Sequence, residues 1–229
     1  KAEVQARSNV QIFVEIFPNG VLGKERETMV QVKGGVIQSY IASTGGMSSY
    51  YPLIDVTNLP FAFSSYNVGY KVYDGEFGQE FAADIEKTTG FKVLGFGESG
   101  GFFAISNSKK PIRSPRDMRG LKIRTMTVPL HQNIIKSLGG SPTPIAWAEV
   151  YTSLQTGLSR IIDASDKGLP ALQARMEVYV PTPAEMRQFR DMTIPEARSF
   201  IEGKYKRKGK YWVDLFLKAI EEAEEELGY

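Results

Sequence analysis

The chain has 229 residues, of which 42% are hydrophobic and 24% are charged, proportions that are ordinary for a globular protein with a buried core. Its 28 basic and 26 acidic residues are mixed throughout and give a net charge of +2, which provides no electrostatic argument for nucleic acid or an anionic membrane as a partner. The absence of cysteine excludes disulfides, thiolate catalysis and cysteine-based metal sites, and no apolar run of about 18 residues is present to span a membrane.

The first part of the chain predicts a β-α-β unit. After a short helical stretch over residues 1–7, hydrophobic and polar side chains alternate over residues 10–17, which is the period of a strand. Residues 24–32 predict a helix that a glycine pair ends, and residues 36–42 predict the next strand. This order favours a parallel sheet, with Thr44 at the carboxyl end of the second strand, where a hydroxyl could contact a ligand. A plain turn is the competing interpretation of that segment.

The middle of the chain predicts helix followed by strands. Residues 67–89 have a helical pattern that is interrupted by Gly75 and Gly78. Residues 91–96 predict a strand, and residues 102–105 predict its partner beyond a glycine-rich turn.

That turn, Gly97-Glu98-Ser99-Gly100-Gly101, fits the G-x-S-x-G pattern of the nucleophile elbow in serine hydrolases. The elbow requires a helix directly after the serine, whereas residues 102–106 have the pattern of a strand. The one histidine, His131, falls in or at the start of a helix instead of on a late loop. A serine hydrolase is therefore the least favoured function for this chain.

Arg124 is the strongest candidate for a binding residue. Residues 121–126 predict a short strand, and residues 129–138 predict a helix that begins with a proline and ends at a glycine pair. Arg124 thus lies near the carboxyl end of a strand and beside a helix amino terminus, where open α/β sheets bind ligands. A guanidinium there could hold a carboxylate with two parallel hydrogen bonds. The competing interpretation is a surface arginine paired with Asp117 or Glu149.

Ordered blocks over roughly 150 positions make the chain resemble the substrate-binding proteins of tripartite ATP-independent periplasmic (TRAP) transporters. The family pattern NSKRPI..P.D..G.KIR is followed by LGA.P.P and E.Y.ALQ.G, and upstream it has FPNGQLG.ERE and LPF. The counterparts in this chain are Ile16 to Gly20, Leu22-Gly23, Glu25, Leu59-Pro60-Phe61, Asn107 to Ile112, Pro115, Asp117, Gly120, Lys122-Ile123-Arg124, Leu138-Gly139, Pro142, Pro144, Glu149-Val150-Tyr151 and Leu154 to Gly157.

The resemblance implies a binding site in which Arg124 clamps the carboxylate of a small organic acid. In the family the position of Phe103 is usually a second arginine, so one of two expected cationic contacts is missing here. Glu98 and Ser99, just before it, would orient the remainder of the ligand. A ligand with one carboxylate and one hydrogen-bond donor is therefore expected to bind better than a dicarboxylate such as succinate.

Two more residues are expected to line this pocket. Thr44 would offer its hydroxyl, and Trp147 would form an apolar floor, because ligand pockets are mostly apolar with few polar anchors. Packing in the core or at a hinge is an equally open role for Trp147. We expect no cofactor and no metal, since no cluster of carboxylates has ligand spacing.

The chain departs from the family after Gly157, where a long section of the second lobe has no counterpart. Either the sequence omits residues at the Gly157–Leu158 junction or the chain carries a true deletion. We favour omission, because removing strands from a packed sheet would expose so much core that the cost in free energy would exceed a marginal stability of about 5–15 kcal/mol. The first strand of the family is also missing. Beyond the junction, residues 176–180 predict a strand, and residues 184–192 and 212–227 predict helices.

The fold class expected from the resemblance is α/β, periplasmic-binding-protein-like, with two lobes around a ligand cleft and a long connecting helix. Residues 1–106 would form mostly lobe I, residues 107–157 mostly lobe II, and residues 158–229 the connecting and C-terminal helices. The expected function is delivery of a carboxylate by a non-enzymatic periplasmic protein to the membrane subunits of a TRAP transporter. Hinge closure would accompany binding. The protein is expected neither to bind nucleic acid nor to insert into the membrane.

Two further expectations complete this interpretation. A ligand sensor on the same scaffold is the alternative function, which neighbouring genes would distinguish from transport. The sequence shows no signal peptide, which is expected to have been removed, and residues 1–9 already have the pattern of the tail of a helix, so we expect the sequence to start inside a domain.

Overall fold

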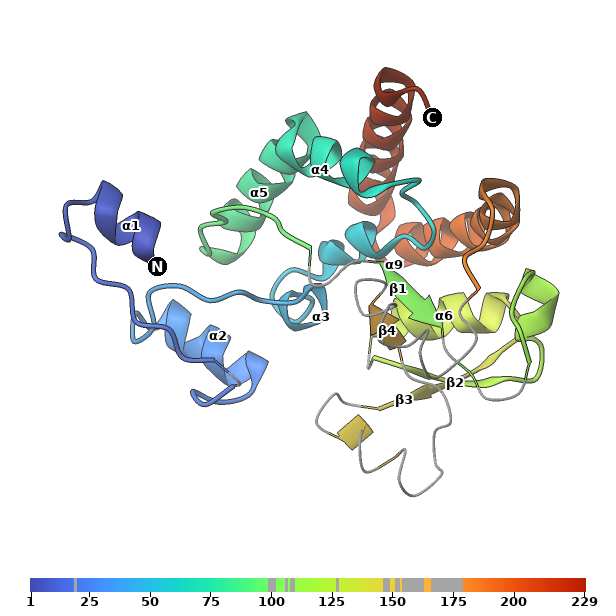
Figure 1. Cartoon of the computed structure of the whole chain (residues 1–229), viewed down its shortest axis with the longest axis horizontal. Helices are drawn as coiled ribbons and strands as arrows, with labels where there is room; N and C mark the ends of the chain where they lie inside the picture. The colour runs from blue at the N-terminus through green and yellow to red at the C-terminus, as the bar shows by residue number, and fades with distance from the viewer. Residues whose placement is uncertain are drawn as a thin grey trace.

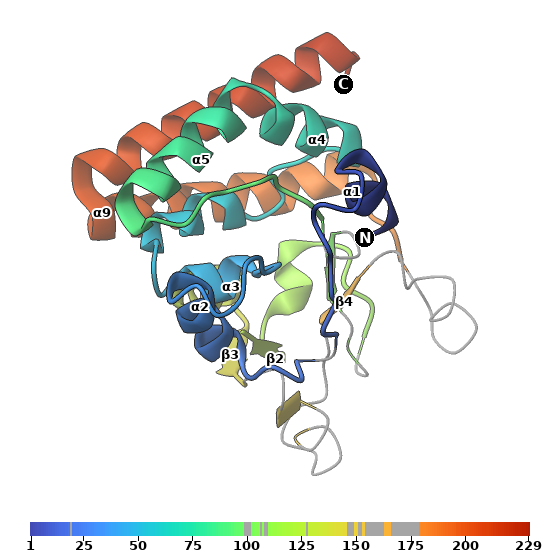
Figure 2. The same ribbon diagram turned by 90° about the vertical axis from the view of Figure 1, so that its left-hand side faces the viewer.

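The computed structural model describes residues 1–18, 20–98, 102–105, 107, 110–126, 128–145, 149–150, 153, 163–165 and 179–229. In this part of the chain, a helical layer lies on one side and a small β-α-β unit on the other, as both views show (Figure 1 and Figure 2). The junction after Gly157 and most of the predicted strand at 176–180 lie outside the described residues.

The helical layer is built from α4 (Tyr66–Asp74), α5 (Glu76–Thr89) and α9 (Pro183–Leu227). The predicted interruption at Gly75 is confirmed, because α4 ends before this residue and α5 begins after it. The interruption at Gly78 is wrong. This glycine lies inside α5, where an added Cβ would fall 1.8 Å from the Tyr73 carbonyl oxygen, so it permits a close approach of the two helices.

The long segment α9 consists of two arms that fold back on each other at Lys206, whose φ of 54° and ψ of −134° interrupt the helix. Figure 2 shows the arms running side by side in opposite directions. An ion pair between Arg190 and Glu224 joins their outer ends at 3.4 Å. The turn needs Gly209, since an added Cβ would lie 2.8 Å from the Ile201 carbonyl oxygen. The two predicted C-terminal helices are therefore real, but each is longer than its pattern indicated.

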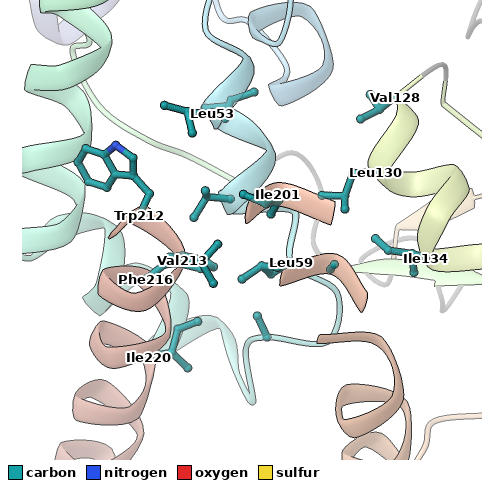
Figure 3. Packing of buried hydrophobic residues seen from close by; sticks show 14 of the residues in the cluster. Leu53, Leu59, Val128, Leu130, Ile134, Ile201, Trp212, Val213, Phe216 and Ile220 are labelled. Carbon is teal, nitrogen blue, oxygen red and sulfur yellow. The ribbon is translucent and has the colours of Figure 1, made fainter. Parts of the chain in front are cut away.

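Aromatic side chains hold α5 against α9 within the helical layer. Phe81, with no exposed surface, packs its ring 5.2 Å from that of Phe77 and 4.9 Å from that of Trp212. The 3-10 helix η1 (Pro52–Asn58) packs against α9, and its Leu53 belongs to the same buried cluster as apolar residues of both α9 arms. Figure 3 shows residues of η1, α9 and α6 converging in this cluster, including Leu59, Leu130, Ile134, Ile201, Val213, Phe216 and Ile220.

The β-α-β unit comprises β2 (Lys122–Thr125), α6 (Pro129–Ser137) and β3 (Ser141–Pro144). Strands β2 and β3 are parallel, with Arg124 opposite Thr143, and the predicted strand and helix over residues 121–138 are confirmed. Strand β3 was not predicted, because it contains two prolines. The prolines are tolerated because the backbone N–H groups that donate to β2 belong to the residues between and beside them. The Ser141 nitrogen, for example, lies 2.8 Å from the Leu121 oxygen.

Three other predicted strands are wrong. Residues 10–17, 36–42 and 91–96 have no strand structure, and Ile41 and Leu94 are 95% and 83% exposed. Alternation of apolar side chains specifies the two faces of a strand, but a strand also needs a neighbour for its hydrogen bonds, and no other segment of the described chain pairs with these residues. The predicted N-terminal β-α-β unit is consequently absent from the described structure.

The remaining elements are short. The predicted helices at 1–7 and 24–32 are confirmed as α1 (Ala2–Arg7) and α2 (Glu25–Lys33), while α3 (Thr44–Met47) and η2 (Pro115–Met118) were not predicted. The strand predicted at 102–105 is confirmed as β1 (Phe103–Ile105), but it pairs with β4 (Asp163–Ser165) and not with residues 91–96. None of the described helices combines the length and apolar character that crossing a membrane requires.

Candidate functional site

Arg124 occupies the carboxyl end of β2 and is only 3% exposed, so it is not a surface arginine. Its Nε and Nη2 atoms both donate hydrogen bonds to the Ile145 carbonyl oxygen, at 3.1 and 2.8 Å. This carbonyl directly follows β3, so the parallel pairing of the two strands fixes the guanidinium at their shared edge. The Asp117 carboxylate, an expected alternative partner, accepts hydrogen bonds from the backbone N–H groups of Arg113 and Ser114, which directly precede η2.

The amino terminus of α6 adds positive potential to this edge. The helix starts with Pro129 as its first residue, and its N-cap residue, Val128, provides no side-chain hydrogen bond to the free N–H groups. His131 lies in the first turn of the same helix. Burial, followed by the charge of Arg124, lowers the pKa of His131 from 6.5 to about 4. The imidazole is therefore neutral near pH 7 and lies within the electrostatic reach of the guanidinium.

The segment that contains Thr44 adjoins the connection between β2 and α6. An added Cβ on Gly45, the next residue, would lie 3.1 Å from the Met126 Cε atom, which shows how closely α3 approaches this connection. Thr44 itself is exposed and donates a hydrogen bond from its hydroxyl to the Asn58 Oδ1 atom at 3.0 Å. Thus the structure brings together the chain segments of two predicted site residues, Thr44 and Arg124.

A carboxylate also supports α3. Glu25 accepts hydrogen bonds from the backbone nitrogen and the hydroxyl of Ser43, at 2.6 and 3.1 Å. Ser43 is the N-cap of α3, and its hydroxyl accepts from the Gly46 nitrogen at 3.0 Å. Glu25, the first residue of α2, therefore fixes the position of α3. The sequence around Glu25 did not predict this contact with Ser43.

Two of the other predicted site residues lie in the described part of the chain. Glu98 is exposed, and Phe103 contributes backbone to β1, opposite Ser165. Ser99 and Trp147 lie outside the described residues. The residues that follow the G-x-S-x-G pattern form β1 and not a helix, so the expected departure from a nucleophile elbow is confirmed.

Thr125 is a polar residue that the sequence analysis missed. It is 4% exposed, and its hydroxyl has no hydrogen-bond partner in the described part of the chain. A buried hydroxyl without a partner costs free energy, so such a group is a candidate contact for a ligand. Sequence gives no signal for it, because a threonine in a strand is ordinary.

We expect the substitution Thr125→Val to stabilise the ligand-free chain by about 1 kcal/mol, because it replaces an unsatisfied hydroxyl by a methyl group of similar size. The measurement is the midpoint of urea unfolding compared with the unsubstituted chain. Thr125→Ala is the matched control, which also removes the hydroxyl but leaves a cavity and should lower the midpoint. A valine variant that unfolds at lower urea would show that the hydroxyl is hydrogen-bonded in solution.

Groups of three or more residues suited to binding a metal ion do not occur among the described residues. The site therefore consists of a buried guanidinium, an imidazole and a helix amino terminus, set beside small polar side chains. These features provide positive potential and hydrogen-bond donors, which are suited to binding an anion.

Sequence comparison assigns the chain to a class of binding proteins. A model of the DctP family, described as bacterial extracellular solute-binding protein, family 7, matches residues 1–176. Because the match covers more than half of the chain, this chain belongs to the DctP family of solute-binding proteins.

Individual relatives agree with this assignment. The 2,3-diketo-L-gulonate-binding periplasmic protein YiaO of Escherichia coli is 32% identical over 163 residues, which are 71% of this chain and 48% of YiaO. The C4-dicarboxylate-binding periplasmic protein DctP of Rhodobacter capsulatus is 31% identical over 155 residues, 66% of this chain and 45% of the relative. The chain thus spans about half the length of the relatives it matches.

Solved structures show the same fold. A TRAP periplasmic solute-binding protein from Desulfovibrio salexigens with bound orotic acid aligns with a TM-score of 0.79 at 16% identity, covering 96% of this chain and 91% of that chain. The sugar-acid-binding protein DctPAm from Advenella mimigardefordensis, in complex with galactonate, aligns with a TM-score of 0.76 at 21% identity, covering 96% and 90%. The expected α/β fold of a two-lobed periplasmic binding protein is confirmed.

Proposed function

We propose that this chain is part of an extracytoplasmic solute-binding protein that delivers a small organic acid to a TRAP-type transporter. The observation that carries the proposal is the buried guanidinium of Arg124, fixed by the Ile145 carbonyl at the carboxyl edge of two parallel strands. Membership of the DctP family supports it. So do the ligands named for its relatives, among them 2,3-diketo-L-gulonate, C4-dicarboxylates and galactonate.

The proposed ligand carries one carboxylate and at least one hydrogen-bond donor. Arg124 would hold the carboxylate through charge-assisted hydrogen bonds. In this arrangement Glu98 and Ser99 accept hydrogen bonds from the remainder of the ligand, Thr44 lines the pocket, and Phe103 takes the place of a second cation. Trp147 would form the apolar floor of the same pocket.

Residues 1–106 and 107–157 are proposed to contribute mostly to the two lobes, and α9 belongs to the connecting and C-terminal helices. Ligand between the lobes would shift the population toward a closed form, which the membrane subunits of the transporter recognise in the periplasm. Binding, closure and release require no covalent bond to be made or broken. The protein therefore acts as a carrier and not as an enzyme.

A thermal-shift screen of organic acids tests this function. D-Galactonate, D-glucuronate, 2,3-diketo-L-gulonate and succinate would each be added to the protein at increasing concentration. A ligand present at 100 times its dissociation constant should add roughly 2.7 kcal/mol to the free energy of unfolding. We expect a monocarboxylate sugar acid to stabilise the protein more than succinate does. A protein whose melting temperature none of these acids changes would contradict the proposed function.

A further inference from the structure

We propose that residues 10–16 are an interaction segment, through which two copies of this chain pair as antiparallel strands about a two-fold axis. The segment begins at the turn that follows α1, and it has the alternation of a strand but no strand partner in the described part of the chain. Figure 1 shows it in blue between α1 and α2, at the outer side of the molecule. Such pairing is separate from the proposed function of carrying an acid.

The apolar side chains of this segment are in contact with water. Val10, Ile12, Phe13 and Ile16 are between 55% and 70% exposed. Monomeric proteins rarely leave contiguous apolar surface of more than a few hundred Å² uncovered, and larger patches mark sites of interaction. A segment that has strand alternation and contains neither proline nor glycine is also a template for pairing with another chain. Residues 10–16 therefore combine uncovered apolar side chains with a backbone suited to a strand ladder.

The start of the segment has a strained backbone. Val10 has a φ of 61°, a region that β-branched residues rarely adopt, and its backbone N–H donates a hydrogen bond to the Gln5 oxygen at 2.7 Å. A residue in an antiparallel strand has a φ of about −140°, so Val10 would lose this strain on pairing. The unpaired conformation is thus unfavourable at the point where the strand would begin.

The apolar pattern of the segment fits a second copy of itself. A two-fold axis at Phe13 sets Ile12 of one copy opposite Val14 of the other. The same axis sets Val10 opposite Ile16. Because side chains alternate between the faces of a strand, all these aliphatic side chains then lie on one face of the pair. The two Phe13 rings meet on the other face, at the axis.

The single charge of the segment selects this register. With the axis at Phe13, each Glu15 carboxylate lies opposite a Gln11 amide, which can donate a hydrogen bond to it. A slip by one or two residues would set Ile12 or Phe13 opposite this carboxylate, and an axis at Glu15 itself would oppose two like charges. The net charge of +2 for the whole chain gives little repulsion between copies.

Size-exclusion chromatography with light scattering, at increasing protein concentration, measures the association. A standard interface has about 20–30 residues on each side, whereas this segment has seven, so we expect a reversible dimer that dissociates on dilution. Ile12→Lys places an ammonium group on the apolar face and should raise the dissociation constant of the dimer at least about tenfold. Ile41→Lys is the matched control, because Ile41 is 95% exposed and lies outside the segment. Both variants should keep the circular dichroism spectrum of the unsubstituted chain.

Disulfide formation tests the register, because the chain contains no cysteine of its own. Phe13→Cys would set two cysteines opposite each other, with Cα atoms about 4.5–5.5 Å apart, within the range of a disulfide. In Gln11→Cys the two cysteines would lie four residues apart along the ladder, about 14 Å, which is too far. We expect mild oxidation to give a covalent dimer of the first variant and not of the second. A mixture of Gln11→Cys and Glu15→Cys chains should cross-link as a heterodimer.

Three outcomes would overturn the inference. The first is a chain that stays monomeric at about 200 µM, well above the dissociation constants of weak interfaces. The second is an Ile41→Lys variant that weakens association as much as Ile12→Lys, since the segment would then pair with residues 36–42 and not with itself. The third is association without a Phe13→Cys cross-link, which would assign the contact to another surface, such as the edge of β2.

Discussion

The substitution Arg124→Lys should weaken the binding of an organic acid by at least about 30-fold, which corresponds to about 2 kcal/mol. Lysine keeps the positive charge but cannot donate two parallel hydrogen bonds to a carboxylate, and it loses the double contact that Nε and Nη2 make with the Ile145 oxygen. The measurement is isothermal titration calorimetry with the acid that stabilises the protein most in the thermal-shift screen.

Lys122→Gln is the matched control for this experiment. It removes a cation from the same strand, but one that is exposed, and it should change the affinity less than about twofold, the usual small effect of a surface charge. The unfolding midpoint of each variant shows whether a loss of binding reflects a loss of folding. Equal affinities of the Arg124→Lys variant and the unsubstituted protein would remove Arg124 from the ligand site.

The substitution Phe81→Ala should reduce the free energy of unfolding by about 3–5 kcal/mol, which is a large part of a typical total of about 5–15 kcal/mol. The Phe81 ring has no exposed surface and lies against the rings of Phe77, Trp212 and Tyr51, the last at 5.5 Å. Its removal would leave a cavity where α5, η1 and α9 meet. Urea unfolding followed by circular dichroism measures the loss.

Phe17→Ala removes the same number of atoms at a residue that is 49% exposed. It should change the free energy of unfolding by no more than about 0.5 kcal/mol, the usual range for a surface substitution. If the two phenylalanine variants unfolded at the same urea concentration, the packing of α5 against α9 would not hold this chain together.

Local signals predicted the β2–α6 part of the site. About twenty consecutive residues contain all the signals: a strand bounded by turn residues, a proline at the first helical position and two glycines after the helix. They were enough to place Arg124 at a strand end beside a helix. They could not show its burial, because this depends on the Ile145 carbonyl, 21 residues further along the chain.

Contacts distant in sequence account for what was missed. The alternation over residues 10–17 is that of a strand. A strand forms only when it pairs with a neighbouring strand, and the alternation does not predict which segment that would be. The position of the turn in α9 was also hidden, since Lys206, Arg207 and Lys208 are good helix formers, although Gly209 follows them. The reversal is marked by the positive φ at Lys206. The approach of Thr44 to the start of α6 likewise depends on Glu25, 18 residues before the N-cap that it binds.

The two prolines of β3 determine at which edge the small sheet can accept a further strand. Pro142 and Pro144 direct their ring nitrogens, which carry no hydrogen, away from β2. The outer edge of β3 therefore has carbonyl groups but no N–H donors at these two positions. A further strand could not form a continuous ladder of backbone hydrogen bonds along this edge. Any segment that enlarges this sheet, whether from elsewhere in the protein or from another molecule, would have to add beside β2.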